Sequence, residues 1–196
     1  FTGLAQGTEL YLINEGPDEP FGGGVPGVDF PFADPATTGQ VMKFVVGPLL
    51  STDTSTPPAA LALPVIPKLG PPDNVRQVTL NEEDSATVRV ITDENGNVVL
   101  DCENGEPFGP ARALLGTLNP DGTSRSLLWT DPAGITENPV LNTTEVWEIY
   151  NFTMDAHPIH LHLVKFEVVD RQNLMSVDGM AMQPAMLVGA PIPPEV

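Results

Sequence analysis

The chain has 196 residues, of which 26 are acidic and 8 are basic, and its formal net charge is −18. This excess of negative charge excludes nucleic-acid binding by phosphate neutralisation and disfavours binding to anionic membranes. The 22 prolines and 18 glycines favour short strands joined by turns, and no apolar stretch reaches the roughly eighteen residues of a membrane span.

Two strands separated by a long loop are predicted at the start of the chain. Residues 4–13 alternate between apolar and polar and end in Glu-Leu-Tyr-Leu-Ile, and residues 40–46 form the second strand. The intervening residues 14–39 are rich in Gly, Pro and Asp and are predicted to be a loop. Residues 47–73 are rich in proline and predict an extended linker. Because two strands cannot form a stable sheet alone, residues 1–46 need further strands from elsewhere.

Several short strands are predicted after the linker, in residues 74–196. Asn95-Gly96 lies between two of them and is a hairpin signal. Cys102 is the only cysteine and has no flanking histidine, so we interpret it as a structural thiol and not as a metal ligand. The predicted strands cover residues 75–80, 86–92, 98–100, 126–129 and 144–151. This spacing, with almost no helical period, indicates an all-β sandwich or barrel.

All 3 histidines of the chain fall within six positions, at His157, His160 and His162. Imidazole is the commonest metal-ligating side chain, and it suits copper, zinc, iron and nickel. A single His-X-His pair arises by chance in many chains, but this clustering indicates a metal site. We predict a strand from His157 through Val169, which would place His160 and His162 on one face. His157 lies at an odd offset and, allowing for Pro158, would serve a second site.

Four of the 6 methionines lie in the twelve residues from Met175 to Met186, in a segment predicted to be a loop. Thioethers are soft ligands that suit Cu(I), but methionine also fills irregular apolar gaps. An apolar lid is the favoured interpretation of this methionine segment, and extra copper binding is the alternative. Asp155 and Glu167 flank the histidines and could orient the rings, but solvated surface carboxylates are the favoured interpretation.

The sequence His-Pro-Ile-His-Leu-His, followed by Leu-Val-Lys-Phe-Glu-Val-Val, resembles the third cupredoxin domain of multicopper oxidases. The resemblance is to the bacterial spore-coat laccase and bilirubin oxidase branch, and it extends to residues 143–151 and 39–46. It implies an all-β, Greek-key cupredoxin-like sandwich, incomplete, in residues 74–196. Residues 1–46 would be the last strands of the preceding cupredoxin domain, and residues 47–73 the linker between them.

The resemblance also implies a role for each histidine. His157 would bind the type 1 copper, which accepts electrons from the substrate. His160 would bind the type 2 copper, and His162 would bind one copper of the type 3 pair. Together, the type 2 and type 3 coppers form the trinuclear centre that reduces dioxygen. The implied cofactor is therefore copper, held at two centres that this segment shares with residues elsewhere.

Other ligands that the family needs are absent from these 196 residues. The family has two further His-X-His motifs in its first domain and a late His-Cys-His segment, for which Cys102 cannot substitute. We expect other chains or segments to supply domain 1, the rest of domain 2 and the late segment. A nicked polypeptide, one subunit of a split enzyme and a partial chain are all compatible with this expectation.

The resemblance implies a laccase-like oxidoreductase that couples one-electron oxidation of phenols, pigments or metal ions to four-electron reduction of dioxygen to water. It also implies an extracytoplasmic location, whether secreted, periplasmic or coat-associated. A copper-binding cupredoxin-like module without turnover is an alternative from another class. A mononuclear cupin-type enzyme is a further alternative, but it would need a later histidine, which the sequence lacks.

Overall fold

The structure is a computed structural model, and it describes residues 3–131 and 135–194. The predicted all-β class is confirmed: the described residues form strands and one 3₁₀ turn, Pro58–Ala60, without an α-helix. Residues 1–2, 132–134 and 195–196 belong to the predicted domains but lie outside the described residues. The described part of the chain also contains no helix long and apolar enough to cross a membrane.

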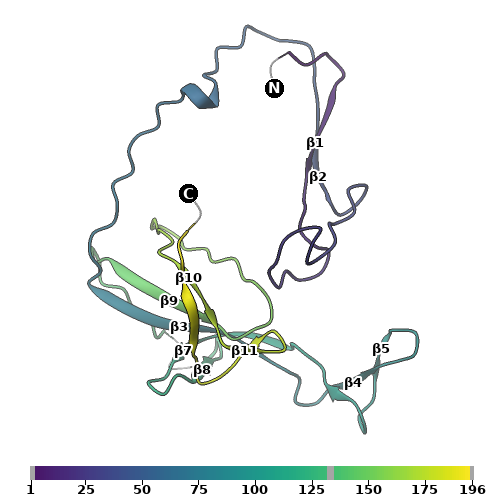
Figure 1. Cartoon of the computed structure of the whole chain (residues 1–196), viewed down its shortest axis with the longest axis vertical. Helices are drawn as coiled ribbons and strands as arrows, with labels where there is room; N and C mark the ends of the chain where they lie inside the picture. The colour runs from purple at the N-terminus through teal and green to yellow at the C-terminus, as the bar shows by residue number, and fades with distance from the viewer. Residues whose placement is uncertain (1–2, 132–134, 195–196) are drawn as a thin grey trace. The chain divides into compact units, whose positions relative to one another are not determined.

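Two compact units divide the chain (Figure 1). The first unit contains residues 1–68 together with residues 155–157, and the second contains residues 69–154 and 158–196. In the first unit the two predicted strands are confirmed, and β1 (Glu9–Ile13) pairs antiparallel with β2 (Gln40–Val45). The loop between them is closed at its base by the amide of Asn14, which donates to the carbonyl of Gly39 at 2.8 Å.

The main sheet of the second unit has four strands in the order β8-β7-β3-β9. β3 (Asn74–Glu83) pairs antiparallel with β7 (Arg112–Leu118), and β7 pairs antiparallel with β8 (Ser124–Leu127). β9 (Glu145–Asn151) lies beside β3 in parallel, as Figure 1 shows. β7 was not predicted from the sequence, because its apolar residues do not alternate and Gly116 lies at its centre.

The predicted hairpin at Asn95-Gly96 is confirmed. β4 (Arg89–Thr92) pairs with β5 (Val98–Leu100), and β6 (Glu106–Pro107) pairs with the other edge of β4. Gly96 has a φ of 82°, a left-handed conformation that glycine adopts without steric cost. The chain then turns after β5, and Cys102 lies exposed in this turn.

The methionine segment is a loop over most of its length, as predicted, but it contains a short hairpin that the sequence did not predict. β10 (Arg171–Leu174) pairs with β13 (Leu187–Ile192), and β11 (Ser176–Val177) pairs with β12 (Met180–Ala181) between them. Asp178 and Gly179 form the tight turn of the inner hairpin, and both have positive φ. The short strands escaped prediction because Gly and Pro interrupt any period in this region.

The strand predicted from His157 to Val169 is wrong: these residues are in irregular backbone. A strand needs a neighbouring strand to accept its ladder hydrogen bonds, and none of the strand pairings among the described residues includes this segment. Leu163, with a φ of 64°, also breaks the extended conformation. The apolar residues that suggested a buried strand, such as Leu163 and Phe166, are exposed here.

Few side chains are buried, and several of those that are buried are polar. The buried set comprises Ala33 in the first unit and Thr79, Asn81, Phe152 and Thr153 in the second. In the second unit they lie on β3 and just after the adjacent β9, so the core sits at the end of the β3–β9 pair from which the histidine segment departs.

Candidate metal centre

The histidine segment is anchored at the end of β9. The amide of Phe152 donates to the carbonyl of Leu80 at 2.9 Å, which extends the β3–β9 pairing by one residue. The side-chain oxygen of Asn151 accepts hydrogen bonds from the amide and the hydroxyl of Thr153, at 3.1 and 2.8 Å. This arrangement is an Asx turn, which ends the strand and redirects the chain. The segment therefore starts from a fixed and buried point four residues before His157.

The register of β9 on β3 is fixed at the other end of the strand by Arg76. Its guanidinium donates to both carboxylate oxygens of Glu145, at 2.6 and 3.0 Å, and to Glu137 at 2.9 Å. A bidentate Arg–carboxylate pair fixes geometry as well as charge. Arg76 holds the pKa of Glu145 below its ordinary value, and the hydrogen bonds that Arg76 donates to Glu145 and Glu137 raise its own pKa. The sequence analysis missed this contact, because its partners are about sixty to seventy residues apart.

His160 and His162 are close together in space. Their ring centroids are 4.9 Å apart, and the rings meet edge to face at 83°. Both side chains are exposed. The sequence predicted that these two rings would be neighbours, and they are, although irregular backbone and not a strand brings them together.

The two rings do not form a complete metal site by themselves. Across residues 3–131 and 135–194, no group of three or more His, Cys, Asp or Glu side chains is arranged to hold a metal ion. Two neighbouring imidazoles fit copper as part of a ligand set, because imidazole is one of its preferred donors. A stable site needs additional donors, and an incomplete coordination shell binds metal weakly.

His157 is exposed and is grouped with the first unit, together with Asp155 and Ala156. The amide of Ala156 donates to the carbonyl of Phe21 at 2.7 Å. The residue immediately before His157 is thereby bound to the loop between β1 and β2. His160 and His162 belong to the second unit, so one of the three histidines lies in the first unit and two lie in the second.

Glu167, which flanks the histidines in sequence, and Cys102, the cysteine of the chain, have different surroundings. One oxygen of Glu167 accepts from the amide of Leu69 at 3.3 Å and lies 3.6 Å from the ammonium of Lys165. Glu167 is thus engaged by groups other than the histidine rings. Cys102 lies in the turn after β5, where Asp101 accepts hydrogen bonds from two backbone amides.

The methionine segment is held mainly by its backbone. The amide of Met175 donates to the carbonyl of Met186, and the amide of Met182 donates to the carbonyl of Met175, both at 2.8 Å. The side chains of Met175, Met180, Met182 and Met186 are all between 38% and 49% exposed. Such partial exposure fits an apolar surface better than a closed metal site.

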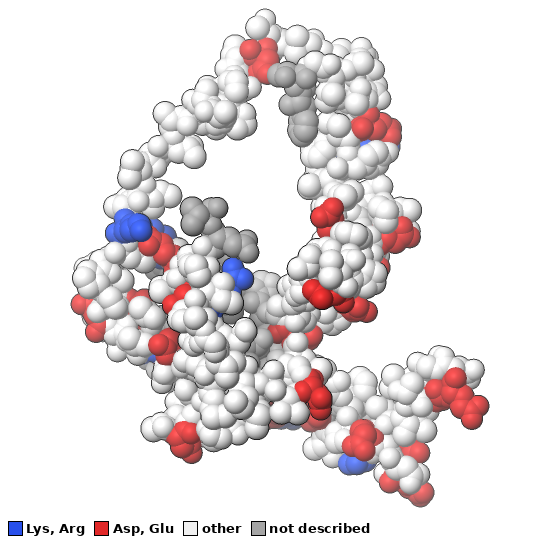
Figure 2. All heavy atoms as spheres, viewed as in Figure 1, with Lys and Arg blue, Asp and Glu red and all other residues white. Residues whose placement is uncertain are grey.

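Figure 2 shows acidic side chains outnumbering basic ones on the face in view. The sheet formed by β4, β5 and β6 is one acidic region, with exposed Glu94, Glu103 and Glu106. Its Asp93 carboxylate accepts hydrogen bonds from the amides of Asn95 and Asn97, which lower its pKa. Because backbone amides occupy one Asp93 oxygen and the Asn97 side-chain amide donates to the other, we interpret this region as a solvated surface.

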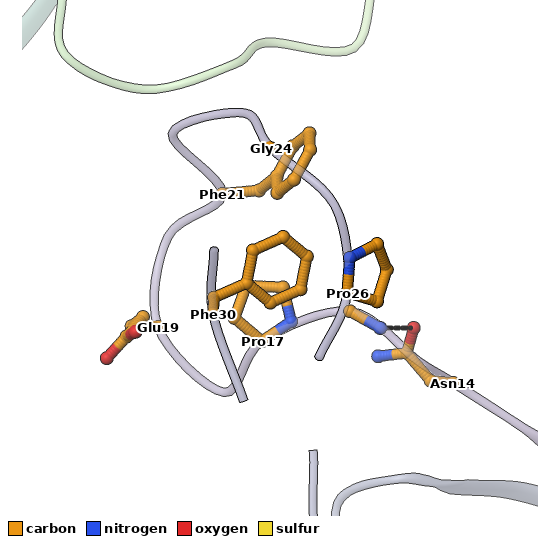
Figure 3. A pocket seen from close by; sticks show the side chains of 8 residues that line it. Asn14, Pro17, Glu19, Phe21, Gly24, Pro26 and Phe30 are labelled. Atoms are coloured by element: carbon orange, nitrogen blue, oxygen red, sulfur yellow. Dashed lines mark hydrogen bonds between the residues drawn. The ribbon is translucent and has the colours of Figure 1, made fainter. Parts of the chain in front are cut away.

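The loop of the first unit encloses an open, mostly apolar hollow of about 410 Å³ (Figure 3). The rings of Phe21 and Phe30 meet edge to face there, with centroids 5.5 Å apart and an interplanar angle of 81°. Pro17 and Pro26 complete the apolar lining, while Asn14 and Glu19 lie at its polar side.

The described residues form an all-β fold with open sheets, which fits an incomplete cupredoxin-like sandwich, and they bring two histidine rings close together. Residues 112–185 match the family model for multicopper oxidase. The chain is therefore a segment of the multicopper oxidase family, whose cofactor is copper, and the sequence resemblance is confirmed. The histidines and the methionine segment up to Pro184 both lie within the matched residues.

Three curated relatives illustrate the similarity. A laccase of Bacillus stratosphericus is 47% identical over 77 residues, which cover 34% of this chain and 15% of that protein. A laccase of Bacillus subtilis (strain 168) is 49% identical over 63 residues, which cover 30% of this chain and 12% of that protein. The rice protein named multicopper oxidase LPR1 homolog 1 (Oryza sativa subsp. japonica) is 32% identical over 141 residues. These residues cover 72% of this chain and 19% of that protein. The chain thus spans less than a fifth of the length of these relatives.

Proposed function

We propose that this chain contributes copper ligands to a laccase-like multicopper oxidase. The oxidase would couple one-electron oxidation of a reductant to the four-electron reduction of dioxygen to water. The observation that carries the proposal is the pair of rings, His160 and His162, 4.9 Å apart within the residues that match the family. The names of the relatives, laccase and multicopper oxidase, support the same reaction class.

We assign the histidines as the resemblance implies: His157 to the type 1 copper, His160 to the type 2 copper and His162 to a type 3 copper. Copper, when bound, supplies the one-electron steps and the chemistry of dioxygen. The chain's own contribution is to present imidazole nitrogens as copper ligands. The Asx turn at Asn151 and the β3–β9 pairing support the start of this segment, while the Ala156 amide ties the residue before His157 to a second element.

The assembled enzyme would include polypeptide outside these 196 residues. We propose that other segments or chains supply domain 1, the rest of domain 2 and the late His-Cys-His ligands. Residues 1–46 would end one cupredoxin domain, residues 74–196 would form most of the next, and residues 47–73 would link them. The exposed apolar residues after the histidines, including Leu163, Val164 and Phe166, support this proposal because they suit a strand that lacks its neighbour.

The reductant would be a phenol, a pigment or a metal ion. The net charge of −18 favours cationic reductants, because a negative surface attracts cations over distances set by ionic strength. We further propose an extracytoplasmic location, which follows from the resemblance to secreted and coat-associated oxidases.

A copper-binding module without turnover is the second candidate. Within the part of the chain that the structure describes, no three metal-ligating side chains converge, and this observation favours the second candidate for an isolated segment. The two candidates differ in one respect that can be measured: only the oxidase consumes dioxygen when a reductant is added.

Single histidine substitutions in the copper-loaded enzyme test the proposal. We expect His157→Ala to abolish the intense blue absorption of type 1 copper. We expect His160→Ala and His162→Ala to keep the blue absorption but to lose most oxygen uptake with a phenolic reductant. Substitution of a residue that only orients a metal ligand typically costs about 10–100-fold in metal affinity or activity, so loss of a ligand itself should cost at least as much. Copper that binds without blue absorption or oxygen uptake would support the module and contradict the oxidase.

A further inference from the structure

The loop between β1 and β2 is held in a defined conformation by several internal hydrogen bonds. The amide of Ala33 donates to the carbonyl of Gly16 at 2.9 Å, and the amide of Gly27 donates to the carbonyl of Phe30 at 2.8 Å. The carboxylate of Asp29 accepts from the amide of Val25 at 2.7 Å. These bonds close the loop on itself at several points, so its carbonyl groups have defined positions.

Gly24 shows how closely this loop is packed. Its φ is 102°, and a Cβ added there would lie 2.7 Å from the Cβ of Asp29. Any other residue would therefore be strained in backbone and in contact. The edge-to-face pair of Phe21 and Phe30, shown in Figure 3, lies across the same hollow. Such a pair stabilises its surroundings beyond the area it buries, which helps to fix the backbone of Phe21.

The carbonyl of Phe21 accepts the hydrogen bond from Ala156, at 2.7 Å. Residues 155–157 are accordingly grouped with this loop, although they follow β9 in sequence. Since His157 itself lies in irregular backbone, this hydrogen bond holds the residue next to it where no strand pairing does.

We propose that the β1–β2 loop, residues 14–39, is a positioning element for His157. Through the Phe21 carbonyl it fixes the backbone that carries this imidazole, and the Phe21–Phe30 ring pair holds that carbonyl in place. The inference rests on the proposed function, in which His157 binds the type 1 copper. The properties of a type 1 centre depend on ligand geometry, so the loop would set the spectrum and potential of that centre alone.

Removal of the hydrogen-bond donor tests the proposal in the copper-loaded enzyme. Ala156→Pro deletes the amide hydrogen, and Ala156→Ser is the matched control that keeps it. Phe30→Ala removes the ring partner of Phe21, with Phe30→Tyr as its control. We expect Ala156→Pro and Phe30→Ala to weaken copper retention at the blue centre by about 10-fold or more, or to shift its reduction potential. The controls and the trinuclear copper signals should stay unchanged.

Three outcomes decide between this inference and the proposed function. If the parent enzyme is blue and both test variants keep its absorption and potential, the loop has no positioning role and the inference is overturned. If the parent is not blue, or if His157→Ala remains blue, the proposed function fails and the inference fails with it. If Ala156→Pro does not fold, Phe30→Ala alone decides, and thermal unfolding shows whether its blue centre changed independently of stability.

Discussion

Thr79 and Asn81 are the polar residues in the core of the main sheet. Thr79 is completely buried and Asn81 is 6% exposed, and the Asn81 amide donates to the Thr79 hydroxyl at 2.8 Å. The side-chain oxygen of Asn81 has no hydrogen-bond partner within the residues that the structure describes. A buried polar group that is only partly satisfied makes its remaining hydrogen bond important for stability.

Thr79→Val should destabilise the chain by about 1–3 kcal/mol, because it leaves the Asn81 amide buried without an acceptor. The double variant Thr79→Val/Asn81→Leu should recover most of that loss, since replacing both partners by apolar groups of similar shape is nearly neutral. Urea unfolding of the parent, the single variants and the double variant measures the coupling. Additive effects of the two substitutions would contradict this account.

At the residue level, the sequence predicted the histidine cluster and the proximity of two of its rings. This was possible because both signals are local, within six positions of each other. The Arg76 contacts and the Phe21–Ala156 hydrogen bond could not be predicted, since they join residues far apart in sequence. The sequence signal for this polar core is that Thr79 and Asn81 are two residues apart and therefore share one face of a strand, and this spacing alone does not show that the face is buried.

β7 packs closely against its two neighbours at Gly116. A Cβ added at this position would lie 2.6 Å from the Thr79 hydroxyl oxygen and in closer contact with the carbonyl of Arg125 on β8. The first contact is with a buried side chain and the second is with backbone, so neither can move away easily. The glycine is therefore required by the packing of three strands.

Gly116→Ala should lower the free energy of unfolding by about 1–3 kcal/mol, the usual cost of overpacking. Gly47→Ala is the matched control, because a Cβ there meets nothing within 4 Å and its φ is not positive. The control should change stability by less than about 0.5 kcal/mol. Equal effects of the two substitutions in thermal or urea unfolding would show that the sheet does not pack as described.

The contact of Arg76 with Glu145 gives the β3–β9 pair a defined dependence on pH. The pKa of Glu145 is lowered from 4.5 in the folded chain, so the unfolded state binds its proton first as pH falls. This contribution is present above pH 4.5 and is lost as pH falls through the folded pKa. Other carboxylates with lowered pKa act in the same direction, namely Glu9, Asp53, Asp93, Asp101 and Asp121.

Glu145→Gln should therefore reduce, but not abolish, the decrease in the free energy of unfolding as the solution becomes acidic. Glu94→Gln, at the exposed tip of the β4–β5 hairpin, controls for the loss of one negative charge. Urea unfolding at a series of pH values below 5 gives the slope for each variant. The account is contradicted if Glu145→Gln and Glu94→Gln give the same slope as the parent.

At the element level, prediction succeeded where a strand has its partner nearby in sequence. The β4–β5 hairpin follows directly from Asn95-Gly96, and β9 follows from its alternating residues. Prediction failed from His157 to Val169, where the apolar pattern is typical of a strand but the described residues supply no neighbour. The residue pattern indicates the tendency to form a strand, while the pairing depends on polypeptide outside the segment.

Over the whole molecule, the accessible surface is 15623 Å². A compact protein of 20.9 kDa would expose roughly 9,000 Å². The excess includes large apolar side chains such as Trp129, which is 96% exposed. This open surface supports the proposal that further polypeptide covers these sheets and completes the ligand sets of the three histidines.

The central claim is that these histidines belong to copper centres that other polypeptide completes. Its most direct test is to measure bound copper together with the intact mass of every polypeptide in purified, blue, active enzyme. We predict that copper is retained only where polypeptide beyond the 20.9 kDa chain is present. A preparation containing the 20.9 kDa species alone, with a full copper complement and blue absorption, would contradict the claim.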